Sequence, residues 1–370
     1  MPAPVQASLM KNPSQEPIRL INRPHFLVLD GLRGVAAITV LIFHFMEIIV
    51  PDPSKSFITH GYLAVDFFFC LSGFVIAYAY DNRIGQSGSW AFFRLRLIRL
   101  HPLVVIGALI GLICFVIDPF SKLYALKGPG KTALMFISGS LMIPYPAVPE
   151  RYHNLFHLNP PTWSLMWEYI ANIVYALILY RISRKTLMGL TIIAAIALCI
   201  TATVYGNVGV GWGIGNEYGG LPRVAGSFLL GMLVFRSGWR INNALGFVPI
   251  AVLLLLAFLV PYRTDLNRYT EPFLVLIYFP FLIALGAGTQ TGQFWNGRCK
   301  WLGDLSYPLY MVHYPFIWLF MSYLEARKPA AAQLWVLVPI LTVALLTFAH
   351  LIMTYVDTPI RRYLSGKRIA

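Results

Sequence analysis

The sequence predicts an all-α membrane protein, a polytopic bundle of about ten transmembrane helices. Hydrophobic residues make up 58% of the 370-residue chain and charged residues only 12%, whereas soluble domains have about 25% charged residues. Apolar runs long enough to cross a bilayer recur along the chain. Lys and Arg gather in the segments on one side of these runs, as the positive-inside rule requires. Composition, run length and charge placement therefore favour the same fold class.

Ten apolar runs are predicted to span the membrane. They cover residues 26–50, 61–80, 100–118, 162–181, 187–205, 220–236, 246–262, 272–290, 304–322 and 332–356. A further apolar stretch at 132–144 has only 13 residues and is followed by five prolines over residues 144–161. We expect this short stretch to be re-entrant or interfacial rather than spanning.

The charge distribution predicts that both termini are cytoplasmic. In that orientation, 19 of the 29 Lys and Arg residues lie on the cytoplasmic side. Residues 1–25 then form a cytoplasmic N-terminal segment without a signal-peptide pattern, residues 26–357 the transmembrane domain and residues 358–370 a cytoplasmic tail. The net charge of +14 follows largely from this topology, so it does not indicate nucleic-acid binding.

The first span carries an arginine and a histidine on one face. It contains LDGLRG at residues 29–34, and His44 follows Arg33 by eleven positions. Steps of 100° bring His44 back to within about 20° of Arg33, roughly 16 Å further along the helix. We interpret His44 as a general base and Arg33 as a cation for an anionic co-substrate. The alternative is a snorkelling arginine and a histidine bonded to a neighbouring carbonyl.

Glu47 lies three residues after His44, on a similar face of the same helix. Its carboxylate either orients the imidazole or simply reaches the outer surface. We favour the outer surface.

The cytoplasmic connection between the second and third spans is strongly basic. It reads FFRLRLIRLHP at residues 92–102, with arginines at positions 94, 96 and 99. Guanidinium groups in such an array suit multidentate phosphate binding, so Arg94, Arg96 and Arg99 are candidate ligands of a phosphorylated co-substrate. The alternative is that they only anchor the chain at the inner interface.

The fourth span begins with WSLMWE at residues 163–168, and Glu168, Asn172 and Tyr175 share one helical face. Counted from its outer end, Glu168 reaches about the same depth as His44. We therefore expect Glu168 to orient His44 as part of a base–orienter pair. The alternative is an ion pair between Glu168 and an arginine of another helix.

The ninth span begins with GDLSYPLYMVH at residues 303–313, which places Ser306, Tyr310 and His313 on one stripe. A buried histidine there is either a participant in the chemistry or a satisfied structural donor. The four cysteines form no CxxC pair, and no pattern of ligands indicates a metal site. Neither a phosphate-binding glycine loop nor a serine-hydrolase motif occurs.

Taken together, these motifs resemble the acyltransferase-3 family of integral-membrane acyltransferases. The family is marked by an Arg, ten residues and a His in the first helix, by a basic FxxxRLxRLxP-like segment, and by WSLxxE and GxxSYPLYxxH segments, all of which are matched in order. It usually ends its last helix with Glu-x-Pro-x-Arg. Here the sequence is DTPIR at residues 357–361, so the carboxylate is one methylene shorter. The resemblance covers nearly the whole chain.

The resemblance implies transfer of an acyl group, commonly acetyl, from a coenzyme A thioester such as acetyl-CoA to a hydroxyl. The implied acceptor is a carbohydrate of a surface polysaccharide, a lipopolysaccharide or a lipid-linked intermediate, and the implied location is the bacterial inner membrane. Some members carry an appended hydrolase-like domain; we expect none here, so the membrane domain would do all the chemistry.

The roles implied for single residues follow the motif positions. Coenzyme A phosphates would lie on the three arginines of the basic segment, with Arg33 and Arg361 as further contacts. His44 would take the acceptor proton, Glu168 would orient it, and Tyr307, Tyr310 or His313 would donate to the oxyanion.

Two other functions fit a bundle with intramembrane charges. One is a transporter or flippase for a polysaccharide intermediate, although no inverted repeat stands out. The other is a catalytically silent subunit of a polysaccharide assembly machinery. Turnover of a coenzyme A thioester by the purified protein separates the enzyme from both.

Overall fold

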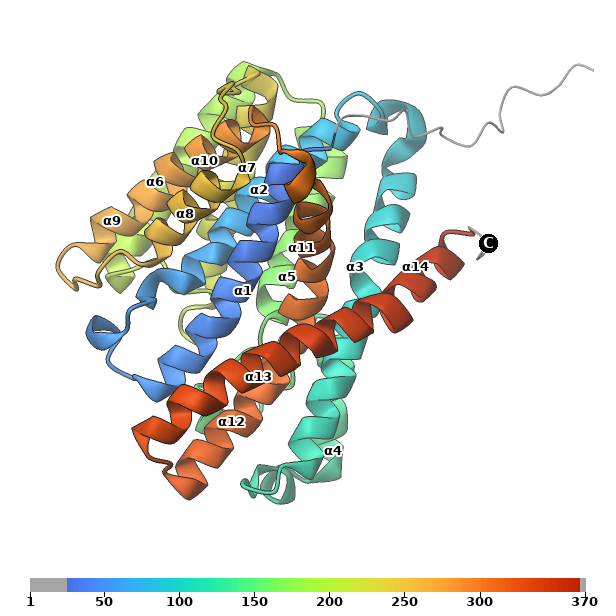
Figure 1. Cartoon of the computed structure of the whole chain (residues 1–370). Helices are drawn as coiled ribbons and strands as arrows, with labels where there is room; N and C mark the ends of the chain where they lie inside the picture. Colours follow the sequence, from blue (N-terminus) through green and yellow to red (C-terminus); the bar gives the residue numbers. More distant parts are fainter. Residues whose placement is uncertain (1–24, 367–370) are drawn as a thin grey trace, which may run out of the picture.

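The computed structural model describes residues 25–366, which form a bundle of helices (Figure 1). Within these residues the chain has no β-strand and only two isolated β-bridges. The predicted all-α polytopic fold is confirmed. The predicted N-terminal segment 1–25 lies outside the described residues except for its last position, as do the final four residues of the predicted tail.

The helices follow one another along the chain in the order that Figure 1 labels. They are α1 (Leu27–Ile49), α2 (Ala64–Tyr80), α3 (Ile84–Ile117), α4 (Leu123–Ser140), α5 (Thr162–Val174), α6 (Arg184–Tyr205), α7 (Gly220–Ser237), α8 (Phe247–Phe258), α9 (Asn267–Phe273), α10 (Phe279–Ala287), α11 (Gln293–Val312), α12 (Tyr314–Arg327), α13 (Ala331–Ile352) and α14 (Thr358–Leu364). One π-helical turn each follows α5, α9 and α13 and continues their helices: Tyr175–Leu179, Leu274–Tyr278 and Met353–Asp357.

Eight helical stretches within residues 25–366 are long and apolar enough to cross a membrane. They contain α1, α2, α3, α5, α6, α7, the pair α9–α10 and the pair α13–α14. The other two predicted spans also form helices. Residues 246–262 contain α8, which has only 12 residues, and residues 304–322 contain the end of α11 and most of α12, which are separated at His313.

Two segments differ in local structure from what the sequence pattern indicates. The basic segment 92–102, expected as a connection between spans, is helical and belongs to the 34-residue α3, whose helix is kinked at Gly88. The stretch 132–144 largely forms the second half of α4, after a kink at Gly128, and α4 packs beside α3 (Figure 1). The interfacial position of this stretch stays a prediction.

Helices α1 and α11 cross where two glycines let their backbones meet. A Cβ on Gly34 would lie 2.6 Å from the carbonyl oxygen of Leu302, and one on Gly303 would lie 2.7 Å from the Cβ of Asp30. Only glycine permits such an approach. The crossing also brings the Arg33 guanidinium to the α11 backbone, where Nη2 donates to the carbonyl of Gly303 at 2.6 Å.

Helices α2 and α7 are joined by two ion pairs and a close crossing. Near one end Arg223 bonds Asp66 at 2.6 Å, and near the other Arg236 bonds Asp81 at 2.7 Å. Between them, a Cβ on Gly231 would overlap a backbone oxygen of α2. Because Asp66 and Arg223 are both buried, their pairing removes the large cost of an isolated charge inside the bundle.

We expect Gly34→Ala to lower the stability of the bundle by about 1–3 kcal/mol, because the new methyl group would press on the α11 backbone. Thermal unfolding in one detergent measures the effect. Gly226→Ala in α7 is the matched control: its Cβ would meet its nearest atoms at 3.7 Å, an ordinary contact. Equal unfolding temperatures for the two variants would contradict the proposed crossing.

We expect Asp66→Asn to cost about 3–5 kcal/mol of stability, because it leaves the buried Arg223 guanidinium without its counter-charge. Replacing both partners, Asp66→Leu with Arg223→Met, should restore much of that loss. Thermal unfolding of the single and double variants checks this prediction, and a single variant as stable as the parent would contradict it.

Candidate active site

Two cavities inside the bundle hold most of the predicted site residues. The larger, about 480 Å³, contains His44 in its wall together with Glu47 and many aromatic side chains. The smaller, about 120 Å³, is lined by Arg33, Arg96 and Arg99 among others. In the following we call them the aromatic cavity and the basic cavity. Tyr310 and Val65 line both, so the two cavities meet at these residues.

His44 is held by the carboxylate that follows it on α1. Its Nδ1 lies 2.6 Å from Oε1 of Glu47, one helical turn further on. When Glu47 is ionised, Nδ1 carries the proton and donates it to this carboxylate, so that Nε2 keeps its lone pair. This is the arrangement that makes an imidazole a general base. The preference for Glu47 as a surface group was therefore wrong.

The imidazole of His44 is also fixed by rings from the α11–α12 break. His313 stacks on it with ring centroids 5.3 Å apart, and Tyr314 meets it edge-on at 4.6 Å. Nδ1 of His313 donates to the carbonyl of Leu309 at 3.0 Å. His313 is buried and its Nε2 has no hydrogen-bond partner among the described residues.

The basic cavity contains three guanidinium groups in different states of pairing. Arg33 donates to Ser306 at 2.9 Å and to the α11 backbone. Arg96 donates to Glu168 at 2.8 Å. Arg99 is exposed and makes no hydrogen bond to any described residue. The cavity thus has three cations and one carboxylate in its wall.

The structure does not bring Glu168 to His44. Glu168 accepts hydrogen bonds from Arg96 and from Ser72, at 2.8 and 2.9 Å, and lines the basic cavity. The prediction that Glu168 orients His44 was wrong, because depth along a helix does not determine which way a side chain points around it. The alternative, an ion pair with an arginine of another helix, is what the structure has.

The other arginines predicted to bind phosphate lie differently. Arg94 is exposed and is absent from the cavity wall, because two positions along α3 turn it roughly 160° away from Arg96. Arg361 pairs with Asp357 at 2.5 Å on the last helices and is absent from the wall of the basic cavity. The predicted tail from residue 358 begins as α14, which continues the last span.

Two hydroxyl groups lie where the cavities meet. Ser164 and Tyr310 share a hydrogen bond of 2.7 Å and are both buried. Tyr307 is less available as a donor to an oxyanion, because its hydroxyl already donates to the carbonyl of Leu100 at 2.6 Å. Of the three oxyanion donors considered from sequence, Tyr310 therefore has the best placed hydroxyl. Ser164 was not singled out, although it stands in the WSLMWE motif.

The aromatic wall of the larger cavity could not be anticipated from any single motif. Its rings come from α1, α5, α11, α12 and four connecting segments: Phe43, Tyr62, Tyr152, Trp163, Trp212, Tyr262, Tyr310, Tyr314 and Trp318. Only the folded chain brings them together. The sequence signal available was an aromatic content of 15%.

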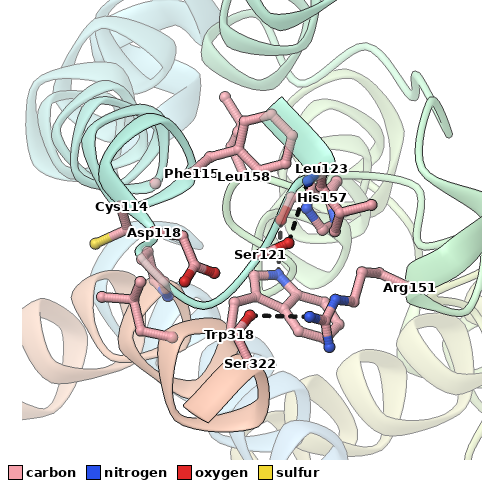
Figure 2. A pocket seen from close by; sticks show the side chains of 13 residues that line it. Cys114, Phe115, Asp118, Ser121, Leu123, Arg151, His157, Leu158, Trp318 and Ser322 are labelled. Carbon is pink, nitrogen blue, oxygen red and sulfur yellow. Dashed lines mark hydrogen bonds between the residues drawn. The ribbon is translucent and has the colours of Figure 1, made fainter. Parts of the chain in front are cut away.

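A third, small cavity lies next to this wall (Figure 2). It measures about 20 Å³ and lies beside Arg151, His157 and Trp318. Trp318 lines both this cavity and the aromatic one, and its indole donates to the carbonyl of His157 at 2.8 Å. Burial, together with the charge of Arg151, lowers the pKa of His157 to about 3, so this ring is neutral and structural.

Within residues 25–366, no group of three or more His, Cys, Asp or Glu side chains could hold a metal ion. The chemistry that the arrangement supports with its own side chains is proton transfer at His44 beside a site for an anion. A base, hydroxyl donors and a cationic cavity in contact are the elements of acyl transfer from a phosphorylated donor.

Comparison with known proteins agrees with this geometry. Residues 26–354 match a family described as an acyltransferase domain. A protein of Rhizobium radiobacter, "Protein 2 in picA locus", is 35% identical over 189 residues, which cover 49% of this chain and 96% of that protein. Peptidoglycan O-acetyltransferase OatA of Listeria monocytogenes is 24% identical over 92% of this chain. A putative O-acetyltransferase of Staphylococcus aureus is 24% identical over 90%.

The aligned regions cover 56% and 57% of the Listeria and Staphylococcus proteins, so the chain spans little more than half their length. No solved structure gives a significant match. With the family domain matched over residues 26–354, the chain belongs to the acyltransferase-3 family.

Proposed function

We propose that this protein is a membrane-embedded O-acyltransferase that moves an acyl group, acetyl in the simplest case, from a coenzyme A thioester to a hydroxyl of a carbohydrate. One observation carries the proposal: a cavity with three guanidinium groups meets a cavity that contains a histidine paired with a carboxylate. The first suits an anionic donor, and the second suits activation of a hydroxyl.

The donor would bind with its phosphates at the basic cavity. Arg99 has free donor groups there, while Arg33 and Arg96 add positive charge and hold fixed positions. Along α1, His44 lies roughly 16 Å beyond Arg33, a distance that an extended pantetheine arm can span. The thioester would then reach the junction at Tyr310.

The proposed reaction uses His44 as both base and acid. Its Nε2 takes the proton from the acceptor hydroxyl while the hydroxyl oxygen forms a bond to the thioester carbonyl carbon. The carbon–sulfur bond then breaks, and the leaving thiolate receives the proton that His44 carries. The products are an ester and free coenzyme A, so atoms and charge balance. Glu47 is a positioning residue that fixes the tautomer and stabilises the imidazolium.

Other residues would assist without touching the transferred proton. The hydroxyls of Tyr310 and Ser164 lie at the junction, where the thioester oxygen gains negative charge during attack. His313 would hold the ring plane of His44 by stacking. Glu168 would position Arg96 for the donor rather than His44 for the acceptor.

The acceptor would occupy the aromatic cavity. A volume of about 480 Å³ falls within the usual range of small-molecule sites, about 300–1,000 Å³. The relative named peptidoglycan O-acetyltransferase supports a carbohydrate acceptor, free or lipid-linked. With both termini in the cytoplasm of a bacterial cell, the basic cavity faces the cytoplasmic half of the inner membrane and His44 the outer half.

We expect the purified protein, reconstituted in lipid nanodiscs with acetyl-CoA and an acceptor glycan, to release coenzyme A thiol. His44→Ala should slow this release about 10²–10⁴-fold, because the general base is lost. Binding of coenzyme A should stay unchanged in the variant, since His44 lies outside the basic cavity.

Glu47→Gln is a milder variant whose kcat and KM are compared with those of His44→Ala. It keeps the shape of the side chain but removes the charge that fixes the imidazole, so kcat should fall less than in His44→Ala, while KM for the thioester stays constant. Activity of His44→Ala within threefold of the parent would reject the base assignment. Thiol release that needs no acceptor in either protein would reject the transfer reaction.

We expect Arg99→Ala to weaken coenzyme A binding by about 1.5–3 kcal/mol, the value of a hydrogen bond to a charged group. The loss should appear as a raised KM for the thioester and should shrink at high salt. Arg94→Ala is the matched control, since it removes the same charge from the same helix outside the cavity. Equal losses in the two variants would point to general electrostatic attraction instead.

A further inference from the structure

The permanent positive charge in the wall of the aromatic cavity is compensated within the protein. Among the described residues that line the cavity, only His44, Glu47 and Arg223 belong to types that carry charge near neutral pH. His44 and Glu47 pair with each other at 2.6 Å. Arg223 is therefore the one permanent cation among the described residues of this wall. The cavity can attract an anion only if the guanidinium of Arg223 is not already paired.

The guanidinium of Arg223 is already bonded to protein groups and is not available to a ligand. Nε and Nη2 bond the two carboxylate oxygens of Asp66 at 3.1 and 2.6 Å, and Nη1 donates to the carbonyl of Val210 at 2.8 Å. Its guanidinium also lies over the ring of Trp163, 5.2 Å from the centroid. With 1% of its surface exposed, Arg223 is a structural part of the wall.

Negative charge, in contrast, lies both in the wall and behind it. The side chain of Glu47 is 35% exposed and faces the cavity beside His44. Behind the wall, Glu271 is fully buried and accepts a hydrogen bond of 2.5 Å from the hydroxyl of Tyr62. A carboxylate or phosphate entering the cavity would meet these groups without finding a free cation, which costs affinity.

What the wall offers instead is aromatic faces and neutral hydroxyls. Tyr152 and Tyr262 line the cavity, and their hydroxyls make no hydrogen bond to any described residue. Tyr152 is set in a left-handed backbone conformation, with φ of 61°, between Arg151, which bonds Glu325, and the bridge of Asn154 to Gly213. Aromatic faces with free hydroxyls suit a ligand that has apolar ring faces and many hydroxyl groups.

We infer that the aromatic cavity binds an uncharged sugar unit and excludes sugar units that carry a carboxylate or a phosphate. The inference rests on the proposed function for the role of this cavity as the acceptor site. The two cavities then sort the two substrates by charge: the donor is drawn to the uncompensated guanidinium groups, and the acceptor must be neutral where it enters the cavity beside His44 and Glu47.

The test is a binding measurement without any donor. Trp163, Trp212 and Trp318 line the cavity, so ligand binding should change tryptophan fluorescence of the protein in nanodiscs. The probes are a panel of neutral trisaccharides, each with its counterpart carboxylated at C6. We expect at least one neutral member to bind about tenfold or more tightly than its acidic counterpart. Absence of any neutral binder, or equal binding of its acidic counterpart, would overturn the inference.

A charge-insertion variant tests the physical cause. Ser56 lines the cavity on the connection between α1 and α2, so Ser56→Lys should bring the ratio of neutral to acidic binding close to one. Ser54→Lys, on an exposed position of the same connection outside the cavity wall, should leave the ratio unchanged. An unchanged ratio in Ser56→Lys would show that charge does not set the selectivity and would overturn the inference.

Because this experiment measures binding alone, its outcome is separate from that of the reaction. Selective binding of neutral sugars by a protein that never releases coenzyme A would reject the transferase and keep the cavity's selectivity. Rapid acylation of an acidic sugar would keep the transferase and reject the cavity's selectivity for neutral sugars.

Discussion

The close crossing of α1 and α11 is the constraint on which the candidate site depends. Gly34 and Gly303 let the two backbones meet, and this contact sets the neighbours of Arg33 and His44 on α1. At one end Arg33 bonds the α11 backbone, and further along His44 stacks on His313. Any outward shift of α11 would loosen both contacts together, which links helix packing directly to the geometry of the proposed base.

Beyond this crossing, the bundle uses ion pairs to neutralise charges that lie inside it. Asp66 neutralises Arg223, while Glu168 compensates only part of the charge of the basic cavity. The same type of interaction therefore has opposite results in adjacent cavities. In one it removes all free positive charge from the wall, and in the other it leaves Arg99 unpaired for the proposed donor.

The sequence allowed the helical bundle and the residues within one helix to be predicted. Arg33 and His44 share a face because eleven residues make almost a whole number of turns, and Ser306, Tyr310 and His313 share a stripe for the same reason. Relations between helices were less predictable. Glu168 was assigned to His44 from depth alone, but rotation about the helix directs it to Arg96. The local i,i+3 spacing was the better guide to the partner of His44.

The groups left unpaired at the site agree with the needs of the proposed reaction. Among the described site residues, Arg99, the Nε2 of His313 and the hydroxyls of Tyr152 and Tyr262 make no hydrogen bond. The exposed groups of this set lie where the phosphates of the donor and the hydroxyls of the acceptor would bind. The groups that position the site, such as Nδ1 of His44 and the guanidinium of Arg223, are already held by hydrogen-bond partners. A site of this kind is preorganised: its substrates complete the hydrogen bonding without breaking the contacts that position the base.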